Sequence, residues 1–473
     1  MLFNSIQFLV FFPVVTIVYF MLAHRLRWAW LLAASCYFYM VFKPIYILIL
    51  AFTIVIDYFA GIYIEKTPQK HLKKRYLVAS LIANIGFLAV FKYYNFFNLN
   101  FSFFLAQFNI KNTIPALDIL LPIGLSFHTF QAMSYTIEVY KGTQKAERHF
   151  GIYALYVLFY PQLVAGPIER PQNVLPQFYK KQTFVYHHAV LGLQRMVWGI
   201  FKKVVIADNL AQYVNPVFEQ PAHYQGIAVI VAIVFFAFQI YCDFSGYSDI
   251  ALGAAQVMGF RLMENFRLPY FSASISEFWS RWHISLSTWF RDYLYIPLGG
   301  NRVGKPRWYF NLVLVFLVSG LWHGANYTYL IWGGLHGFYL IFGLLFLKNK
   351  LLINFLNNRY LHIAVTFFLV CVAWVFFRAK SVADALTILE QATNFSSPTS
   401  WRYLVVSAAQ LKVCVVALVV LIAIENIEPT QGNAFYWLQN RPFWLRYAGY
   451  CSILLSILFL GQFGLTEFIY FQF

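Results

Sequence analysis

Two histidines lie in apolar stretches, and each is flanked by glycines. Residues 320–324 read Gly-Leu-Trp-His-Gly around His323, and residues 333–337 read Gly-Gly-Leu-His-Gly around His336. A histidine kept at membrane depth is costly, so it is expected to be functional. Its imidazole ionises near neutral pH and can accept or donate a proton. The glycines leave room for a neighbouring helix, or for a substrate, to reach the ring. We predict that His323 carries the chemistry.

Two carboxylates interrupt the apolar sequence further upstream, at Asp243 and Asp249. Serine and aspartate are favoured helix caps, so either carboxylate can cap a helix that begins near Ser245 or Ser248. We expect Asp243 to orient a catalytic group or to have a structural role. Neither carboxylate has an obvious metal-ligating partner in the sequence, and we therefore predict no metal site.

A basic and aromatic block spans residues 277–302. Its large aromatic residues recur at helical spacing, and three basic residues fall on other faces: Phe278, Trp282, Trp289 and Tyr293, with Arg281, His283 and Arg291. One interpretation is an amphipathic helix that anchors the chain at the membrane surface. The other is a cytoplasmic mouth in which Arg281, Trp282 and Arg291 bind the phosphates and purine of a donor, since guanidinium groups hold phosphate in a bidentate fork.

The composition places these residues in a membrane protein. Hydrophobic residues make up 60% of the chain and charged residues 11%, whereas soluble proteins carry about a quarter charged residues. Apolar runs of about 20 residues, long enough to cross a bilayer, recur along the chain. The five cysteines are dispersed singly, so we expect no disulfide bonds. We predict an all-α polytopic membrane protein with a single transmembrane domain spanning residues 1–473.

Thirteen apolar segments are candidate spans, and several are short enough to be re-entrant or tilted. They cover residues 6–21, 28–42, 45–64, 76–91, 119–139, 153–164, 189–206, 227–241, 309–322, 327–347, 363–377, 404–424 and 445–460. Residues 95–109 alternate between aromatic and polar types, which predicts an interfacial helix on the outer side. The expected bundle therefore has about 11–13 transmembrane or re-entrant helices.

The net charge of +17 arises largely from basic clusters in short loops beside the candidate spans. The first three clusters lie at residues 25–27, 66–75 and 141–148, with two candidate spans between each and the next. The positive-inside rule places all three in the cytoplasm and the N-terminus outside. Short basic loops that flank spans suit lipid headgroups or an anionic cofactor. We therefore predict membrane lipids as partners and no binding of nucleic acid.

Longer motifs carry a family resemblance. They lie at residues 121–127 (Leu-Pro-Ile-Gly-Leu-Ser-Phe), 161–168 (Pro-Gln-Leu-Val-Ala-Gly-Pro-Ile), 241–249, 277–302 and 321–326 (Leu-Trp-His-Gly-Ala-Asn). With them the chain resembles the membrane-bound O-acyltransferase family, in particular its bacterial branch of polysaccharide O-acetylation proteins, typified by the alginate acetylation membrane subunit.

The resemblance implies a bundle of helices around a central tunnel open towards both faces, with a catalytic histidine at the position of His323. Other residues are expected to line the tunnel or to support it: His336, Trp322, Asn326, Asp243 and His283. His128 departs from the family pattern, and we expect it to pack between helices.

The resemblance and the chemistry of imidazole predict the same reaction. His323 takes a proton from an attacking hydroxyl, and a thioester donor such as acetyl-CoA loses its acyl group to that acceptor. The donor is inside and the acceptor outside, so the acyl group crosses the tunnel. No neighbouring group in the sequence activates the imidazole as a nucleophile, which favours a general base over a covalent intermediate. We expect no resident cofactor, because acetyl-CoA is a substrate.

Several alternatives remain open on the sequence. A transporter also places polar residues at mid-depth but moves its cargo without covalent change, and a non-catalytic assembly scaffold is a further alternative. Within the enzyme class, D-alanyl transfer to a teichoic acid from a carrier protein is the second candidate. The resemblance implies a bacterial inner-membrane location, a polysaccharide acceptor such as alginate or peptidoglycan, and an extracytoplasmic O-acetyltransferase partner.

Overall fold

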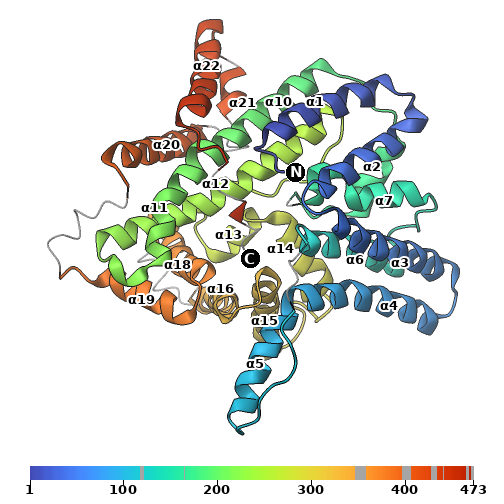
Figure 1. Cartoon of the computed structure of the whole chain (residues 1–473), viewed down its shortest axis with the longest axis horizontal. Coiled ribbons are helices and arrows are strands. Elements are labelled where there is room, and N and C mark those ends of the chain that lie inside the picture. The colour runs from blue at the N-terminus through green and yellow to red at the C-terminus, as the bar shows by residue number, and fades with distance from the viewer. Residues whose placement is uncertain are drawn as a thin grey trace. The chain divides into compact units, whose positions relative to one another are not determined.

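The computed structural model describes residues 1–117, 122–164, 166–346, 358–396, 406–427, 434–439, 441–464 and 468–469. Every regular element within these residues is a helix (Figure 1). The predicted all-α class is therefore confirmed. The beginnings of the predicted spans 119–139 and 404–424, and the last residue of the span 327–347, lie outside the described residues.

The chain divides into two compact units, one formed by residues 1–193 and 251–263 and the other by residues 194–250 and 264–473. Unit 1 contains α1 Ile6–Met21, α2 His24–Met40, α3 Ile47–Lys66, α4 Lys70–Leu88, α5 Tyr94–Ala106, α6 Leu125–Lys141, α7 Phe150–Leu158, α8 Tyr160–Leu163 and α9 Pro171–Tyr179. Two helices contribute to both units: α10 Tyr186–Ile200 and α12 Ile227–Val257. The single domain expected for residues 1–473 stays a prediction.

Unit 2 holds the remaining helices. They are α11 Asp208–Glu219, α13 Ile275–Arg281, α14 Ile284–Phe290, α15 Lys305–His323, α16 Tyr327–Phe346, α18 Arg359–Arg378, α19 Val382–Thr393, α20 Ala408–Ile427, α21 Ala434–Gln439 and α22 Phe443–Leu460. Short 3₁₀ turns cover Pro44–Tyr46, Pro221–His223 and Pro269–Phe271, and π-helical turns cover Ala89–Tyr93, Phe201–Ala207 and Arg291–Tyr295.

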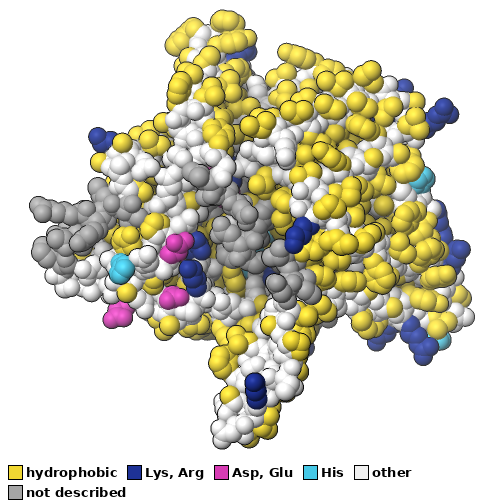
Figure 2. All heavy atoms as spheres, viewed as in Figure 1, with side chains coloured by type: hydrophobic (Ala, Val, Ile, Leu, Met, Phe, Trp, Pro, Cys, Tyr) yellow, Lys and Arg dark blue, Asp and Glu magenta, His cyan; other side chains and the backbone are white. Residues whose placement is uncertain are grey.

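Seven helices among the described residues are long and apolar enough to cross a membrane. They are Pro44–Lys66, Lys70–Ala106, Ile227–Val257, Tyr327–Leu345, Arg359–Arg378, Ala408–Ile427 and Phe443–Leu460. Other predicted spans, such as Ile6–Met21, form helices too short for this criterion. Hydrophobic side chains cover much of the surface shown in Figure 2, including that of α22. The chain is thus a multi-pass membrane protein.

Unit 1 satisfies its buried polar side chains internally. The Asp57 carboxylate on α3 accepts hydrogen bonds from the Ser80 hydroxyl (2.6 Å) and the Asn84 amide (3.0 and 2.9 Å) on α4. His128 on α6 shares a 2.6 Å hydrogen bond with the Thr53 hydroxyl on α3. The expectation that His128 packs between helices is therefore confirmed.

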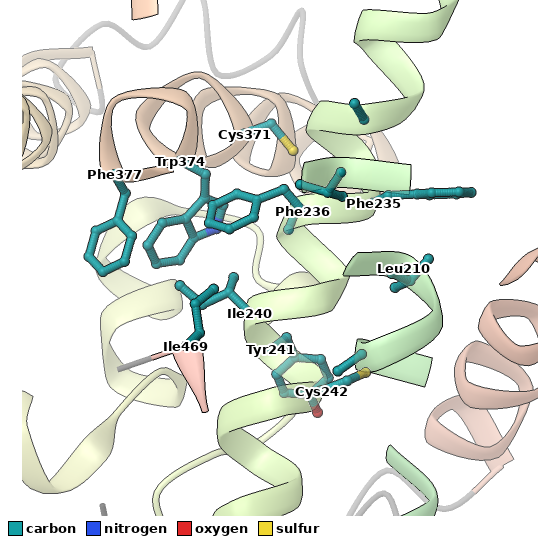
Figure 3. Packing of buried hydrophobic residues seen from close by; sticks show 14 of the residues in the cluster. Leu210, Phe235, Phe236, Ile240, Tyr241, Cys242, Cys371, Trp374, Phe377 and Ile469 are labelled. Carbon is teal, nitrogen blue, oxygen red and sulfur yellow. The ribbon is translucent and has the colours of Figure 1, made fainter. Parts of the chain in front are cut away.

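The core of unit 2 is rich in aromatic residues that surround the middle of α12. Figure 3 shows Trp374 and Phe377 projecting from α18 beside Phe236 of α12, with Ile469 in the same buried cluster. Such rings bury large apolar areas and fix their neighbours by edge-to-face packing. This core provides the rigid surroundings in which the histidines of unit 2 lie.

Two local predictions were wrong. Asp243 and Asp249 do not cap a helix, because both lie inside α12, which runs from Ile227 to Val257. The 277–302 block is not one amphipathic helix, since α13 and α14 are separated at His283, whose backbone is left-handed (φ 43°). The helix predicted over residues 95–109 is present as α5 Tyr94–Ala106, which continues α4 through the π-helical turn Ala89–Tyr93, and its position at the membrane interface stays a prediction.

Candidate active site

His323 is the last residue of α15, at the point where the chain turns back into α16. Gly324 follows it in an extended conformation and ends the helix. The turn is tight because glycines let the two helices meet: a methyl group on Gly320 would collide with the Tyr329 carbonyl, and one on Gly333 with the Phe316 carbonyl. His323 and His336 therefore lie on two different helices, with the break at Gly324.

Asn326 has a clear local function at this turn. Its side-chain oxygen accepts a hydrogen bond from the Thr328 amide (3.1 Å), and its side-chain amide donates to the Lys380 carbonyl (2.9 Å). Asn326 therefore caps the first turn of α16 and fixes the loop to the segment after α18. This position supports the turn that carries His323.

The His323 imidazole is buried among aromatic rings. Its centroid lies 4.8 Å from that of Trp322, 5.1 Å from Trp332 and 5.2 Å from Phe377, all close to edge-to-face. A ring held in this way has little rotational freedom, so its nitrogen atoms point in fixed directions. The surroundings are also low in polarity, which strengthens any charge interaction formed there.

His336 lies on α16, one helical turn after Trp332. Trp332 is 5.2 Å from His336 and 5.1 Å from His323, so both histidines contact one indole. The Trp279 indole N–H donates to Nδ1 of His336 (3.2 Å). When His336 is neutral its proton is therefore on Nε2. Among the described residues, neither this Nε2 nor the Trp332 indole nitrogen has a hydrogen-bond partner.

His283 is brought close to the end of α15 by the break between α13 and α14. It is fully buried, its ring lies 4.6 Å from Phe244 on α12 and 6.3 Å from Trp322, and its Nδ1 is 3.4 Å from Oδ1 of Asn265. Burial lowers the pKa of His283 to about 3, so the ring is neutral at physiological pH.

Asp243 lies in a buried ion-paired group. The Lys203 ammonium is 2.7 Å from Asp243 and 2.8 Å from Asp208, and the Ile469 amide donates to the second Asp243 oxygen (2.7 Å). Such partners stabilise a carboxylate in a buried site. This arrangement ties α12 to α11 and to the C-terminal segment, and it fits the structural alternative of the two expected for Asp243.

The three expected donor residues are in different surroundings. Arg281 pairs with Glu277 (2.6 Å), and the exposed Arg291 pairs with Asp292 (2.8 Å). Trp282 is only 1% exposed and packs against Trp374 and Phe278, so its faces are not open to a purine. Arg291 lines a cavity of about 170 Å³ whose wall includes Trp279.

A charged network between α10 and α12 was not predicted from the sequence. The Arg195 guanidinium contacts Asp249 (2.9 Å) and both oxygens of Glu264 (2.8 and 2.6 Å), and Lys202 contacts Asp249 (2.5 Å). The network borders a cavity of about 330 Å³ in unit 2. Three basic residues within the apolar segment 189–206, Arg195, Lys202 and Lys203, were the available signal, because charges at membrane depth are usually paired or functional.

Comparisons with known proteins identify the class of this helical membrane protein. Residues 149–383 match the MBOAT, membrane-bound O-acyltransferase family, and this region includes His283, His323 and His336. The chain belongs to this family. The prediction that this chain is an enzyme of the O-acyltransferase class is therefore confirmed.

Individual relatives agree with the family match. The chain is 34% identical to the peptidoglycan O-acetyltransferase of Helicobacter pylori, over 100% of this chain and 98% of the relative. It is 40% identical to the probable alginate O-acetylase AlgI of Pseudomonas aeruginosa, over 84% of this chain and 76% of the relative. The identity to the protein of the same name from Pseudomonas putida is 36% over the whole length of both.

Proposed function

We propose that this protein transfers an acetyl group from cytoplasmic acetyl-CoA towards the hydroxyl groups of an extracytoplasmic polysaccharide, with His323 as the general base. The observation that supports this role best is the placement of His323: a buried imidazole, held by aromatic rings, at the end of a helix that glycine stops. The related enzymes are named for acetylation of alginate and of peptidoglycan, and both polymers are polysaccharides.

The proposed step is an acyl transfer between sulfur and oxygen. His323 removes the proton of the attacking hydroxyl, whose oxygen forms a bond to the thioester carbonyl carbon. The carbon–sulfur bond then breaks, and the departing thiolate takes up the proton. Negative charge gathers on the carbonyl oxygen during this step. The Trp332 indole and Nε2 of His336 are uncommitted N–H donors next to His323, and they suit the stabilisation of that charge.

The route of the acetyl group follows from the positions of donor and acceptor. Acetyl-CoA is cytoplasmic and the polymer lies beyond the membrane, so we propose a tunnel through the protein that passes His323. We further propose, as the resemblance to polysaccharide O-acetylation proteins implies, that an extracytoplasmic O-acetyltransferase receives the acetyl group and delivers it to the polysaccharide.

The proposal is tested by donor exchange with the purified protein in liposomes. Labelled acetyl-CoA and a labelled D-alanyl carrier protein are supplied on the outside of separate samples, with short polysaccharide acceptors and the extracytoplasmic O-acetyltransferase partner enclosed. Acetyl transfer with acetyl-CoA alone is the expected result. Transfer from the D-alanyl carrier alone would replace the proposal by the teichoic-acid type of reaction. Movement of label without a new covalent product would favour a transporter.

A further inference from the structure

A long apolar cavity lies in unit 2 between α20, α22 and the end of α10. Its volume is about 360 Å³. It is lined by one face each of residues 412–424 on α20, residues 452–460 on α22, and residues 198–205 on α10 and the π-helical turn that follows. Both α20 and α22 are long and apolar enough to cross a membrane. The medium expected around this cavity is therefore the hydrocarbon of the bilayer.

The lining residues give the cavity the shape of a narrow channel. Ile424 lies twelve residues after Lys412 on α20, and both line the cavity, so the channel runs for about 18 Å. A volume of about 360 Å³ over about 18 Å corresponds to a mean cross-section of about 20 Å². One unbranched hydrocarbon chain fits such a cross-section, whereas a helix, with a diameter of about 10–12 Å, does not.

Hydrogen bonds fix the walls of the channel at both ends. At one end the Gln410 side-chain amide on α20 donates to the Gln212 side-chain oxygen on α11 (2.8 Å). At the other end the Gln194 amide on α10 donates to the Tyr450 hydroxyl on α22 (3.0 Å). The three walls are thus held in place around the channel. Their apolar side chains gain van der Waals contacts when a ligand fills it.

The end of the channel next to α11 is polar. The Leu460 carbonyl at the end of α22 accepts from the Asn209 side-chain amide on α11 (2.8 Å). Lys412, in the second turn of α20, lies at this end and is exposed, with no ion-pair partner in the described part of the chain. The opposite end is lined by the apolar side chains of Ile424 and Trp198. A ligand that fits has a long apolar chain and a negative charge at one end.

The floor of the channel belongs to the π-helical turn Phe201–Ala207. Phe201 and Val205 are buried and line the channel. The neighbouring Lys202 and Lys203 form the buried ion pairs with the carboxylates of α12. A chain in the channel therefore packs against the same turn that carries these charges, and its binding stabilises the turn.

We propose that this channel binds one acyl chain of an anionic phospholipid from the surrounding membrane, with the headgroup phosphate at Lys412. The narrow apolar length selects a lipid chain, and the lysine at its polar end selects a negatively charged headgroup. Such a lipid supports the fold and takes no part in acyl transfer. The inference therefore stands independently of the proposed function.

The test is native mass spectrometry of the purified, delipidated full-length protein, titrated with phosphatidylglycerol or with phosphatidylcholine of the same chain length. The unaltered protein is expected to bind one phosphatidylglycerol about five-fold more tightly than phosphatidylcholine, which is the effect of one lysine beside an anionic headgroup. Lys412→Gln should remove this preference. Lys305→Gln, at an exposed lysine that begins α15, is the charge-matched control and should retain it.

A second pair of variants tests the channel itself. Val416 lines it and Val419 on the same helix does not, although their side chains are almost equally exposed, at 60% and 61%. Val416→Trp should weaken binding of both lipids roughly ten-fold or more, because the indole displaces at least about two methylene groups of the chain. Val419→Trp should bind both lipids as the unaltered protein does. Phosphatidylglycerol should raise the thermal midpoint of Val419→Trp more than that of Val416→Trp.

The outcomes distinguish a lipid site from the alternatives. Equal affinities of the unaltered protein for the two lipids would overturn the inference, and so would equal lipid binding by Val416→Trp and Val419→Trp. A dimer that forms without lipid and is lost in Val416→Trp would assign the channel to a second copy of the chain instead. The expected binding pattern in a protein that transfers no acetyl group would retain the lipid site and reject only the proposed function.

Discussion

At the residue scale, the three buried histidines described in unit 2 share one aromatic environment but have different chemical settings. His323 is held by three rings, His336 accepts a hydrogen bond from Trp279, and His283 lies beside Asn265. Only one of them needs to titrate in the proposed reaction. The other two then act as neutral rings that position groups or donate hydrogen bonds.

The neutral state of His283 predicts a pH dependence of stability. Its pKa in the folded protein is about 3, below the ordinary value of 6.5, so the unfolded chain takes up a proton as the pH falls and the folded protein does not. Stability that is complete above pH 6.5 is therefore lost on acidification, by on the order of 2 kcal/mol between pH 7 and pH 5. His283→Gln should show a shallower fall of the thermal midpoint over this range.

The control for this experiment is His187→Gln, because His187 is exposed on α10. That variant should retain the acid sensitivity of the unaltered protein. Parallel pH profiles for His283→Gln and the unaltered protein would show that His283 is not the buried neutral group described above.

The buried ion pairs of Lys203 give a second prediction at this scale. Lys203→Met leaves Asp243 and Asp208 without their shared cation in a buried site. Breaking such a group by removing one partner typically costs about 3–5 kcal/mol. We expect a large drop in the thermal midpoint, partly recovered in Lys203→Met/Asp243→Asn. Lys305→Met at the exposed start of α15 is the control, and equal midpoints for the two single variants would contradict the structural role of Lys203.

At the element scale, the glycines of the α15–α16 hairpin determine how His323 is presented. Gly320 packs against the Tyr329 carbonyl, whereas Gly343 on α16 has nothing within 4 Å of the position of a β-carbon. Gly320→Ala should therefore force the helices apart, at a cost of about 1–3 kcal/mol, and should lower acyl transfer. Gly343→Ala should be neutral or stabilising by up to about 1 kcal/mol, because alanine favours helices.

Thermal unfolding and turnover of both glycine variants check this prediction. An intact hairpin in Gly320→Ala, with normal midpoint and normal turnover, would mean that close packing at this turn does not position His323.

The elements themselves were predictable to different degrees. Long apolar runs such as 408–427 were recognisable, because span length and composition alone define them. The extension of α12 through Asp243 and Asp249 was not recognisable. It depends on ion pairs with Lys203, Arg195 and Lys202, which are distant in the sequence, and these outweigh the local preference of aspartate for helix caps. The break at His283 depends on a left-handed backbone that side-chain spacing does not reveal.

In the candidate site, too, local features were predictable and features that depend on contacts between distant segments were not. The glycine flanks of His323 are a local feature visible in the sequence, and the candidate spans 309–322 and 327–347 left a gap in which the stop at Gly324 lies. The burial of Trp282 and the cavity lined by Ser248 and Asn265 arise from contacts between separate segments, so no local pattern indicated them. For this reason Trp282, which was expected to bind a purine, is instead enclosed in the aromatic core.

At the scale of the whole molecule, the orientation in the membrane stays a prediction of the sequence. The basic loop at residues 66–75 and the block from Arg281 to Arg307 are expected in the cytoplasm. Lys70→Cys, in a background in which the five native cysteines are replaced, should resist a membrane-impermeant thiol reagent in intact cells and react after permeabilisation. Asn109→Cys, beyond the end of α5, should react in intact cells and serves as the positive control. Efficient labelling of Lys70→Cys in intact cells would reverse the topology.

The central claim is that His323 is the general base of an acetyl transfer, and one comparison tests it most directly. Turnover of labelled acetyl-CoA is measured for the purified unaltered protein and for His323→Ala, with size-exclusion profile and thermal midpoint recorded for both. Removal of a general base is expected to reduce the rate by about 10²–10⁴-fold, in a variant that stays monodisperse and folded. Turnover close to that of the unaltered protein, in a well-folded His323→Ala, would contradict the account.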